Sequence, residues 1–416
     1  MRKLIVLLVF AGALVSAKAQ ILPLDKQRLS ALKEAYLHNN EQAVKMVGFY
    51  EGMAVKLMKD KAPTVKSKIL PPSNDARDYI SLSRYWWPDT TKKDGLPYVR
   101  HDGKVNPEID SYMSEKAMVK MANAVDCLSL LYYVTGKSLY AEHCARYLRA
   151  WFTDSITGMN PNMTYSQFIP GRTKLRGTGI LDARHACRAL CMSALIKDYA
   201  GWTEHDQTQL TEWGKAFLYW MEHSTQGQME RRAKNNHGLW FDVTHMELLA
   251  FLGYENRIRE VLRDDFMQKL NNQIAENGSL PQELARTLSL HYSTFVCEAS
   301  LQASFIAAGI GENLWTMKTA SQKSLADVVA FLYPYYKSPE KWTYKQIKKF
   351  DAQRATPILL EAGKALENKN YTKLAYQLGM TDKSALLMLI TTFRSVTNPI
   401  WQNCRNINDL LIRFRK

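Results

Sequence analysis

Patterns for metal ions, nucleotides and nucleic acids are missing from this sequence. The histidines at 185, 237, 245 and 291 show neither H-x-x-x-H nor H-E-x-x-H spacing, by which one helix presents two imidazoles to zinc. No segment resembles a nucleic-acid-binding motif. We therefore expect no resident metal ion, no cofactor and no nucleic-acid partner.

Cysteine is also scarce, with six residues in a chain of 416. Cysteines scattered in this way do not form a disulfide framework. Cys187 and Cys191 lie four residues apart on an expected helix, where a bridge would strain disulfide geometry. We predict that both are buried small apolar side chains.

A long apolar run occurs only at the amino terminus. Basic residues at positions 2 and 3 precede the run, and Ala17-Lys18-Ala19 forms an A-x-A cleavage site before Gln20. No other stretch approaches the roughly 20 apolar residues of a membrane span. No cysteine for a lipid anchor follows the cleavage site. We predict that residues 1–19 are a signal peptide and that the protein is periplasmic or secreted, without insertion into a membrane.

The rest of the chain lacks both linkers and repeats. No stretch rich in Gly, Ser or Pro divides it, and no sequence repeat of fixed period is visible. We therefore predict one large domain over residues 20–416.

Acidic residues are outnumbered in this chain. It contains 55 Lys and Arg against 40 Asp and Glu, a formal net charge of +15. Residues 1–19 include three basic residues and no acidic one, so their removal lowers the charge by three, to +12. Such a charge concentrates polyanions near the surface, and export favours an acidic polysaccharide as the partner. A surface charged only for solubility is the alternative.

Most of the chain shows helical periodicity, with apolar residues recurring at intervals of three and four. The pattern covers 24–58, 116–135, 139–154, 181–199, 205–223, 240–253, 256–274, 292–309, 313–332, 355–366, 369–379 and 383–394. Strand patterns are scarce, and short turns such as Thr135-Gly136-Lys137 favour antiparallel helix pairs. We expect an all-α fold, either a solenoid or a toroid of helix hairpins. The absence of a repeat disfavours the solenoid.

Two long irregular segments interrupt the helices, and such segments in compact domains are often functional. The first, at about 70–112, is rich in aromatic and basic side chains that can stack on sugar rings and bind carboxylates. The second, at 156–179, can also line a cleft. The predicted substrate contacts in these segments are Arg84, Tyr85, Trp86, Trp87, Gln167, Arg172 and Arg176. The alternative for Trp86 and Trp87 is packing into the core.

Two runs, at 234–240 and 283–292, together contain an amide, an imidazole, a guanidinium and a phenol. Cleavage of a 4-linked uronan by β-elimination needs a neutralised C5 carboxylate, a base for the C5 proton and an acid for the leaving O4. Asn236 and His237 can stabilise the carboxylate as it gains charge. Arg286 can favour the phenolate of Tyr292, whose ordinary pKa is about 10, and so make it a general base.

The stereochemistry of the sugar decides how many groups the elimination requires. In mannuronate or glucuronate the C5 proton and O4 lie on one face, so Tyr292 can serve as both base and acid. In guluronate they lie on opposite faces, and we assign His237 as the base and Tyr292 as the acid.

Residues six apart on a straight helix point about 120° apart, so Arg286 and Tyr292 cannot share a helical face. Leu280-Pro281 indicates that a helix begins only near His291, with Arg286 on the preceding loop. In that arrangement the two side chains can converge.

Each of these residues also has an ordinary structural interpretation. The Asn-Asn-His run can simply cap the helix that begins near Trp240. His291 can pack or orient a neighbour, and Tyr292 can be a core aromatic with a satisfied hydroxyl. We nevertheless include Trp240 and His291 among the predicted substrate contacts.

These residues carry a resemblance to a known family. The run from Asn235 to Trp240, the pattern Leu280-Pro281-x-Glu283-Leu284-x-Arg286 with His291-Tyr292, and the loop Tyr85-Trp86-Trp87-Pro88 are similar to the alginate lyase superfamily of helical-toroid polysaccharide lyases. The nearest branch is polysaccharide lyase family thirty-eight. The resemblance implies an incomplete (α/α) toroid with a tunnel-like cleft and a Trp-rich lid.

The resemblance also implies roles for individual residues. Asn236 and His237 would neutralise the carboxylate, and Arg286 would lower the pKa of Tyr292, the acid and base. The better-known alginate lyases carry the pattern Arg-Ala-Leu-x-Tyr-His-x-Tyr, and alignment on Arg286 places its tyrosines on Leu290 and Ser293. Because Tyr292 stands one residue early, the shift puts the preferred substrate in doubt more than the reaction.

Four functions therefore remain in competition. The sequence favours a lyase acting on uronans, with alginate the first candidate. A glucuronan-specific lyase of the same mechanism is the alternative. A glycoside hydrolase would need two carboxylates in the cleft, for which Asp182, Asp242 and Glu283 are available. A non-catalytic protein that binds acidic glycans would need only the charge and the aromatic loop.

Overall fold

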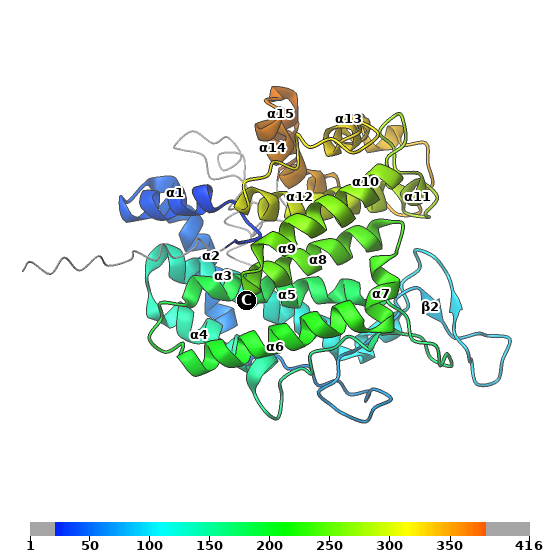
Figure 1. Cartoon of the computed structure of the whole chain (residues 1–416), viewed down its shortest axis with the longest axis horizontal. Helices are drawn as coiled ribbons and strands as arrows, with labels where there is room; N and C mark the ends of the chain where they lie inside the picture. Colours follow the sequence, from blue (N-terminus) through cyan, green and yellow to red (C-terminus); the bar gives the residue numbers. More distant parts are fainter. Residues whose placement is uncertain (1–20, 380–416) are drawn as a thin grey trace, which may run out of the picture.

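The computed structural model describes residues 21–379, so the predicted signal peptide and the predicted helix at 383–394 lie outside the described residues (Figure 1). The first helices are α1(Lys26–Leu37), α2(Glu41–Lys59), α3(Met113–Thr135), α4(Ser138–Leu148), α5(Arg184–Met192), α6(Glu204–His223) and α7(Thr225–Arg231). They are followed by α8(Asn236–Leu252), α9(Glu255–Glu260), α10(Met267–Gln273), α11(Pro281–Leu284), α12(Ser289–Gly309), α13(Leu325–Lys337), α14(Thr356–Ala365) and α15(Lys369–Leu378).

Short 3₁₀ and π segments join or extend several of these helices. They are η1(Pro107–Ser111), η2(Arg149–Thr153), η3(Thr178–Ala183), η4(Ser193–Ile196), η5(Val261–Phe266), η6(Pro339–Lys341) and η7(Ala352–Ala355). The strands are β1(Ile80–Leu82), β2(Trp86–Trp87), β3(Val99–Arg100) and β4(Tyr165–Phe168). The all-α toroid of helix pairs is confirmed, because these short strands form only two-stranded ladders among the described residues.

Helices α3, α5, α8 and α12 pack side by side in chain order, and the other helices cover them. α8 and α12 are buried on nearly every side, so their sequences are apolar all round rather than along one stripe. One cluster of buried apolar side chains extends from Ile21 to Ala375. The functional residues at the first turns of α8 and α12 therefore stand on the most rigid part of the molecule.

Several helix boundaries differ from the prediction; α8, for example, begins at Asn236 and not at 240. The predicted helix at 24–58 is broken, because Asn39 adopts a positive φ of 55° and the Asn40 side chain caps α2. The predicted helix at 313–332 begins only at Leu325, where Ser324 and Asp327 form a capping box. In these last two places a polar cap interrupts an apolar pattern that continues through it.

The two irregular segments are ordered and are joined to each other. β1 from the first segment pairs in parallel with β4 from the second. β2 and β3 form an antiparallel pair, with Trp86 opposite Arg100, and their hairpin projects from the helices at the right of Figure 1. This arrangement brings the two irregular segments, 70–112 and 156–179, to the same end of the toroid.

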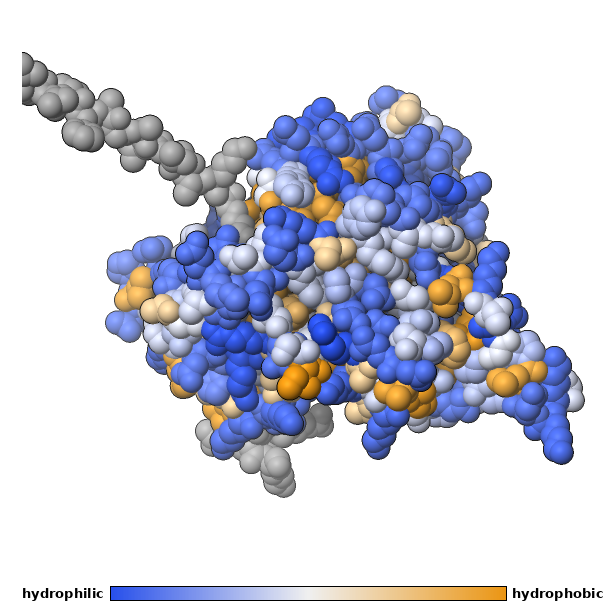
Figure 2. Space-filling view, turned by 60° about the horizontal axis from the view of Figure 1, so that its bottom comes forward, coloured by the Kyte–Doolittle hydropathy of each residue, from blue (hydrophilic) through white to orange (hydrophobic). Residues whose placement is uncertain are grey.

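The surface agrees with the composition of the sequence. The face in Figure 2 is mainly hydrophilic, with small separate apolar patches. Within residues 21–379, no helix is both long and apolar enough to cross a membrane. The five cysteines in this range are buried and unbridged, as predicted for Cys187 and Cys191.

Candidate active site

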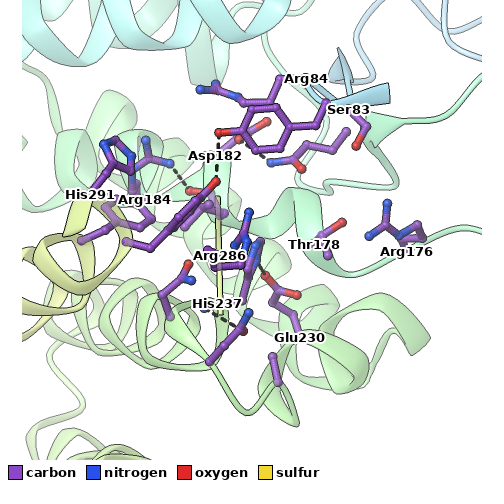
Figure 3. A pocket seen from close by; sticks show the side chains of 18 of the residues that line it. Ser83, Arg84, Arg176, Thr178, Asp182, Arg184, Glu230, His237, Arg286 and His291 are labelled. Atoms are coloured by element: carbon purple, nitrogen blue, oxygen red, sulfur yellow. Dashed lines mark hydrogen bonds and ion pairs between the residues drawn. The ribbon is translucent and has the colours of Figure 1, made fainter. Parts of the chain in front are cut away.

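A cavity of about 420 Å³ lies where the first turns of α8 and α12 meet the two irregular segments (Figure 3). All four residues that were predicted to be catalytic line it: Asn236, His237, Arg286 and Tyr292. Six predicted substrate contacts also line it: Arg84, Tyr85, Trp86, Gln167, Arg176 and His291. Trp87, Arg172 and Trp240 are absent from its lining.

His237 stands at the start of α8 because the Asn235 side chain caps the helix and accepts a hydrogen bond from the His237 backbone N–H at 3.3 Å. Asn235 is thus the helix cap, while the next two side chains remain at the cavity. The imidazole Nδ1 lies 2.5 Å from Oε1 of the buried Glu230 (Figure 3). A carboxylate at Nδ1 holds the proton on that nitrogen and leaves Nε2 free to face a ligand.

Asn236 is fully buried and contacts Glu283. Its amide Nδ2 donates to both carboxylate oxygens of Glu283 at 3.0 and 2.9 Å, and its backbone N–H donates to Oε1 at 2.7 Å. Glu283 is thus bound by Asn236 and forms no ion pair with the described residues. The Asn236 amide thereby anchors α8 to α11, and its carbonyl oxygen has no hydrogen-bond partner in the part of the chain that the structure describes.

Arg286 and Tyr292 converge as predicted. Arg286 lies on the turn between α11 and α12, and Tyr292 lies in the first turn of α12. The guanidinium carbon is 3.7 Å from the centroid of the Tyr292 ring, so the cation stacks on the ring face. The Tyr292 hydroxyl shares a hydrogen bond of 2.9 Å with the Tyr85 hydroxyl.

The expectation that Arg286 brings the Tyr292 pKa down towards neutrality is wrong for this arrangement. Burial raises the pKa of Tyr292 well above its ordinary value, Tyr85 raises it further, and Arg286 opposes these effects without overcoming them. The reason is geometric. The guanidinium lies against the ring, whereas the phenol oxygen faces Tyr85.

His291 is a neutral imidazole at physiological pH. Burial and the adjacent Arg354 lower its pKa to about 3. Its Nδ1 contacts the Arg354 guanidinium, and its ring lies edge-on to Tyr292 at 5.2 Å between centroids. It therefore lines the cavity without a positive charge of its own.

The hairpin of β2 and β3, here called the aromatic hairpin, contributes one of its two tryptophans to the cavity. Trp86 lines the cavity, and the Arg172 guanidinium lies over its outer face at 4.4 Å. Trp87 alternates to the other side of the strand, where its indole N–H donates to the Lys104 carbonyl at 3.0 Å. The structure thus places Arg172 behind Trp86 and Trp87 outside the cavity, contrary to the prediction for both.

Trp240 lies outside this cavity but lines the second cavity described below. It is 2% exposed and packs beneath Phe295, with 4.9 Å between ring centroids. It follows His237 by about one turn of α8, so the two side chains lie on neighbouring parts of the same helix side. Its role is to support the wall of the site.

Sequence reasoning missed part of the lining, including Arg100, Arg184, Glu230 and Arg354. Glu230 belongs to α7, and the turn between α7 and α8 folds it back onto His237. Arg354 comes from η7, far along the chain. Arg184 is the first residue of α5, and the sequence of α5 resembles that of an ordinary amphipathic helix. None of these positions carries a local signal, because tertiary folding alone brings them to the cavity.

Six arginines line the cavity against two carboxylates, those of Asp182 and Glu230. Four of the arginines already have carboxylate partners. Arg84 pairs with Glu115, Arg100 and Arg286 share Asp102, and Arg354 pairs with Glu298. Within residues 21–379, Arg176 and Arg184 form no ion pair. These two guanidiniums are available to anionic groups of a ligand.

The three acids that the sequence offers to a hydrolase, Asp182, Asp242 and Glu283, do not form the pair that such an enzyme requires. Asp182 lines the cavity, but its Oδ2 accepts from the hydroxyls of Tyr79 at 3.0 Å and Ser81 at 2.9 Å. Asp242 is fully buried and bound by Lys269 at 2.5 Å. Glu283 is buried against Asn236. No two of these acids face each other across the cavity.

A second cavity of about 910 Å³ continues from the first. Its own lining includes Gln302, Gln346, Lys348, Lys349 and Phe350. The residues that line both cavities are Arg84, Tyr85, Arg184, His291, Phe295 and Arg354. The site is thus a two-lobed cleft with the Tyr85–Tyr292 contact near its middle.

Comparison with known proteins agrees with this geometry. The family model described as alginate lyase matches residues 64–342. The crystal structure of an alginate lyase from Bacteroides ovatus has a TM-score of 0.85 and 32% sequence identity, and the match covers 90% of this chain and 100% of the other. A search of curated proteins finds no match.

A more distant structure shares the fold. A variant of alginate lyase A1-III from Sphingomonas species A1, complexed with a tetrasaccharide, has a TM-score of 0.58 and 14% identity, with 90% of this chain and 96% of the other covered. Placement in polysaccharide lyase family thirty-eight stays a prediction. The extent of the family match and the similarity to the Bacteroides structure establish that this chain belongs to the alginate lyase family and is a polysaccharide lyase.

Proposed function

We propose that this enzyme cleaves 4-linked uronans, alginate first among them, by β-elimination, with Tyr292 as the acid and base. The observation that carries the proposal is the convergence of Arg286, His237 and the Tyr292 hydroxyl on one arginine-rich cavity. This phenol differs from an ordinary core tyrosine, because the Arg286 guanidinium stacks on its ring and the His291 imidazole lies edge-on to it.

The carboxylate at C5 must be neutralised before its neighbouring proton becomes acidic. Arg184 and Arg176 form no ion pair with the described residues and can meet uronate carboxylates, as can Nε2 of His237 when the ring is protonated against Glu230. Asn236 supports His237 through its contacts with Glu283, rather than meeting the carboxylate directly.

The proton steps belong to Tyr292. Its phenolate takes the C5 proton, the C4–O4 bond breaks as the C4–C5 double bond forms, and the phenol returns the proton to O4. The Arg286 guanidinium on the ring favours the phenolate when it forms, and the Tyr292 hydroxyl then gives up the hydrogen bond that it donates to Tyr85. For guluronate, His237 is the base and Tyr292 protonates O4.

The fold and basic lining also suit a glucuronan-specific lyase, since glucuronate carries the same carboxylate at C5. A panel of polymannuronate, polyguluronate, glucuronan and pectate separates these substrates. The ultraviolet absorbance of the unsaturated uronate product reports cleavage. A hydrolase or a non-catalytic binding protein would release no such product.

The decisive variant is Tyr292→Phe, which removes the proton donor and keeps the ring. We expect turnover to fall by roughly 100- to 10,000-fold, the usual contribution of general acid and base catalysis. His237→Ala is expected to act in the same direction. Tyr219→Phe, an exposed tyrosine on α6, is the control and should retain activity. Near-normal turnover by Tyr292→Phe, with an unchanged circular dichroism spectrum, would refute the mechanism.

We propose in addition that the protein is exported after cleavage of residues 1–19. Sequencing of the amino terminus of the exported protein tests this proposal, with Gln20 as the expected first residue.

A further inference from the structure

The turn that carries Arg286 is held from two sides. On one side the chain at 345–347 pairs with it: the Ile347 N–H donates to the Thr287 carbonyl and the Ser289 N–H to the Lys345 carbonyl, both at 3.0 Å. On the other side lies the end of the aromatic hairpin, at Asp102 and Gly103. The geometry between Arg286 and Tyr292 therefore depends on segments that are remote in sequence.

Asp102 is the centre of the second contact. Its carboxylate accepts from Arg286 Nη2 at 2.8 Å and Nε at 3.3 Å, a two-point contact that fixes the plane of the guanidinium. The Thr287 hydroxyl donates to the same carboxylate at 2.8 Å, and Arg100 of β3 contacts it at 2.6 Å. Partial burial acts to raise the pKa of Asp102, but these donors hold it well below its ordinary value.

The backbone next to Asp102 is packed as closely as the side chain. Gly103 has a φ of +78°, and a Cβ there would lie 2.6 Å from Thr287 Oγ1 and 2.8 Å from Ile347 Cδ1. A side chain at this position would push the hairpin away from the turn. The close approach gives the hairpin and the Arg286 turn one fixed relative position.

We infer that Asp102 is a positioning residue: it holds the Arg286 guanidinium flat against the Tyr292 ring and couples the aromatic hairpin to the catalytic turn. This inference rests on the proposed function of Tyr292 and Arg286. Asp102 does not line the cavity, so it acts through Arg286 and not on the substrate. A long arginine side chain without this anchor has many accessible rotamers, few of which stack on the phenol ring.

Loss of the Asp102 charge has two opposite effects on the pKa of Tyr292. The negative charge itself raises the Tyr292 pKa, so its removal alone would lower that pKa. Release of Arg286 removes a closer positive charge and would raise it. The charged and titratable groups around Tyr292 are Arg84, Tyr85, Asp102, Arg286, His291 and, behind His291, Arg354. The positioning role predicts that the second effect prevails.

The experiment compares Asp102→Asn with Asp94→Asn, measuring kcat and KM against pH on the best uronan. Asp94 lies in the same hairpin, and among the described residues its carboxylate accepts only from the backbone N–H of Leu96. Its variant therefore makes the same charge change without touching Arg286. We expect Asp102→Asn to lower kcat by roughly 10- to 100-fold, the cost of a misplaced catalytic group. The rise of kcat with pH should also move to higher pH, while Asp94→Asn behaves as wild type.

A double variant tests whether Asp102 affects catalysis through Arg286. If Asp102 acts through Arg286, then Asp102→Asn should have no further effect in an Arg286→Ala background. A shift of the pH profile to lower pH would show a purely electrostatic role and overturn the inference. Equal behaviour of the Asp102 and Asp94 variants would overturn it as well.

Thr287→Val provides a second test should Asp102→Asn fold poorly. It removes one donor to Asp102 and keeps the carboxylate, so a smaller change in the same direction is expected, and an unchanged profile would contradict the inference. Failure of the proposed function is distinguishable, because then the wild-type enzyme itself would form no ultraviolet-absorbing product from any uronan.

Discussion

Arginine residues in this cleft differ in what they can do, and the difference lies in their partners. Arg286 is bound by Asp102 and stacks on Tyr292, so its charge is committed to the protein. Within residues 21–379, Arg184 has only the Leu181 carbonyl as a hydrogen-bond partner. It lies over the Trp240 and Phe295 rings at the junction of the two lobes. A guanidinium held in place but lacking a carboxylate partner is suited to bind one from the substrate.

Replacement of Arg184 by glutamine should therefore weaken binding more than chemistry. A hydrogen bond to a charged group contributes about 1.5–3 kcal/mol, so we expect KM to rise by roughly 10- to 100-fold. Steady-state kinetics on the preferred uronan checks this expectation. Arg172→Gln is the matched comparison, because Arg172 lies behind Trp86 and outside the cavity. A larger loss for Arg172→Gln than for Arg184→Gln would contradict the assignment.

At the scale of elements, the start of α8 is the part of the site that tolerates least change. The helix begins at Asn236, and Gly238 in its first turn approaches the preceding chain closely. A Cβ at Gly238 would lie 2.1 Å from the Ala233 carbonyl oxygen. The turn that returns Glu230 to His237 can therefore fold tightly only because residue 238 has no side chain.

Gly238→Ala should displace this turn and separate His237 from Glu230. We expect a loss of stability of about 1–3 kcal/mol, as for other overpacked sites, and at least a tenfold fall in turnover. Thermal unfolding and product absorbance measure the two effects. Gly48→Ala on α2 is the control, since a Cβ there meets nothing within 4 Å and should not reduce stability. Full activity of Gly238→Ala would show that the close approach is not required.

At the scale of the whole molecule, a buried carboxyl affects how stability varies with pH. Glu247 of α8 is fully buried, and neither of its carboxylate oxygens has a hydrogen-bond partner within the described residues. Burial raises its pKa from 4.5 to about 8, although Arg188 acts to lower it. The folded protein therefore retains a proton that the unfolded chain releases. Its stabilising contribution is fully present below pH 4.5 and is lost as the pH rises to about 8.

Glu247→Gln should remove this dependence on pH. Relative to the wild type, the variant should gain on the order of 3 kcal/mol of unfolding free energy between pH 5 and pH 9. Denaturant unfolding across that range measures the difference. Glu142→Gln, at an exposed position on α4, should leave the wild-type slope unchanged. A Glu247→Gln curve parallel to the wild type would disprove the assignment.

The net charge also acts on the whole molecule. With a formal charge of +12 after loss of residues 1–19, the enzyme should attract a polyanion over several ångströms of solvent. Screening shortens that range from about 10 Å at 0.1 M salt to about 3 Å at 1 M. Between about 0.1 M and 1 M salt, we expect KM for a long uronan to rise severalfold while kcat changes little. An equal salt response of kcat and KM would point to an effect on the fold instead.

The helical toroid and the identity of the catalytic candidates could be predicted from the sequence because both rest on local patterns. Apolar spacing determines most helices, and an Asn-Asn-His run at a helix start or a proline before Arg286 is visible without coordinates. The positions of Trp87 and Arg172, which line neither cavity, could not be found in this way. Which side of a strand or helix faces a cleft depends on what packs against the other side.

The sequence by itself therefore determined the residue types of the site, the all-α architecture and the basic charge. Tertiary structure alone decided which arginines of the cleft have a carboxylate partner. Four of the six arginines form ion pairs with Asp102, Glu115 or Glu298. Tertiary structure also decided the state of Tyr292, whose neighbour Arg286 meets the ring and not the oxygen. Ionisation depends on burial and on distances of a few ångströms, and only the folded chain sets these.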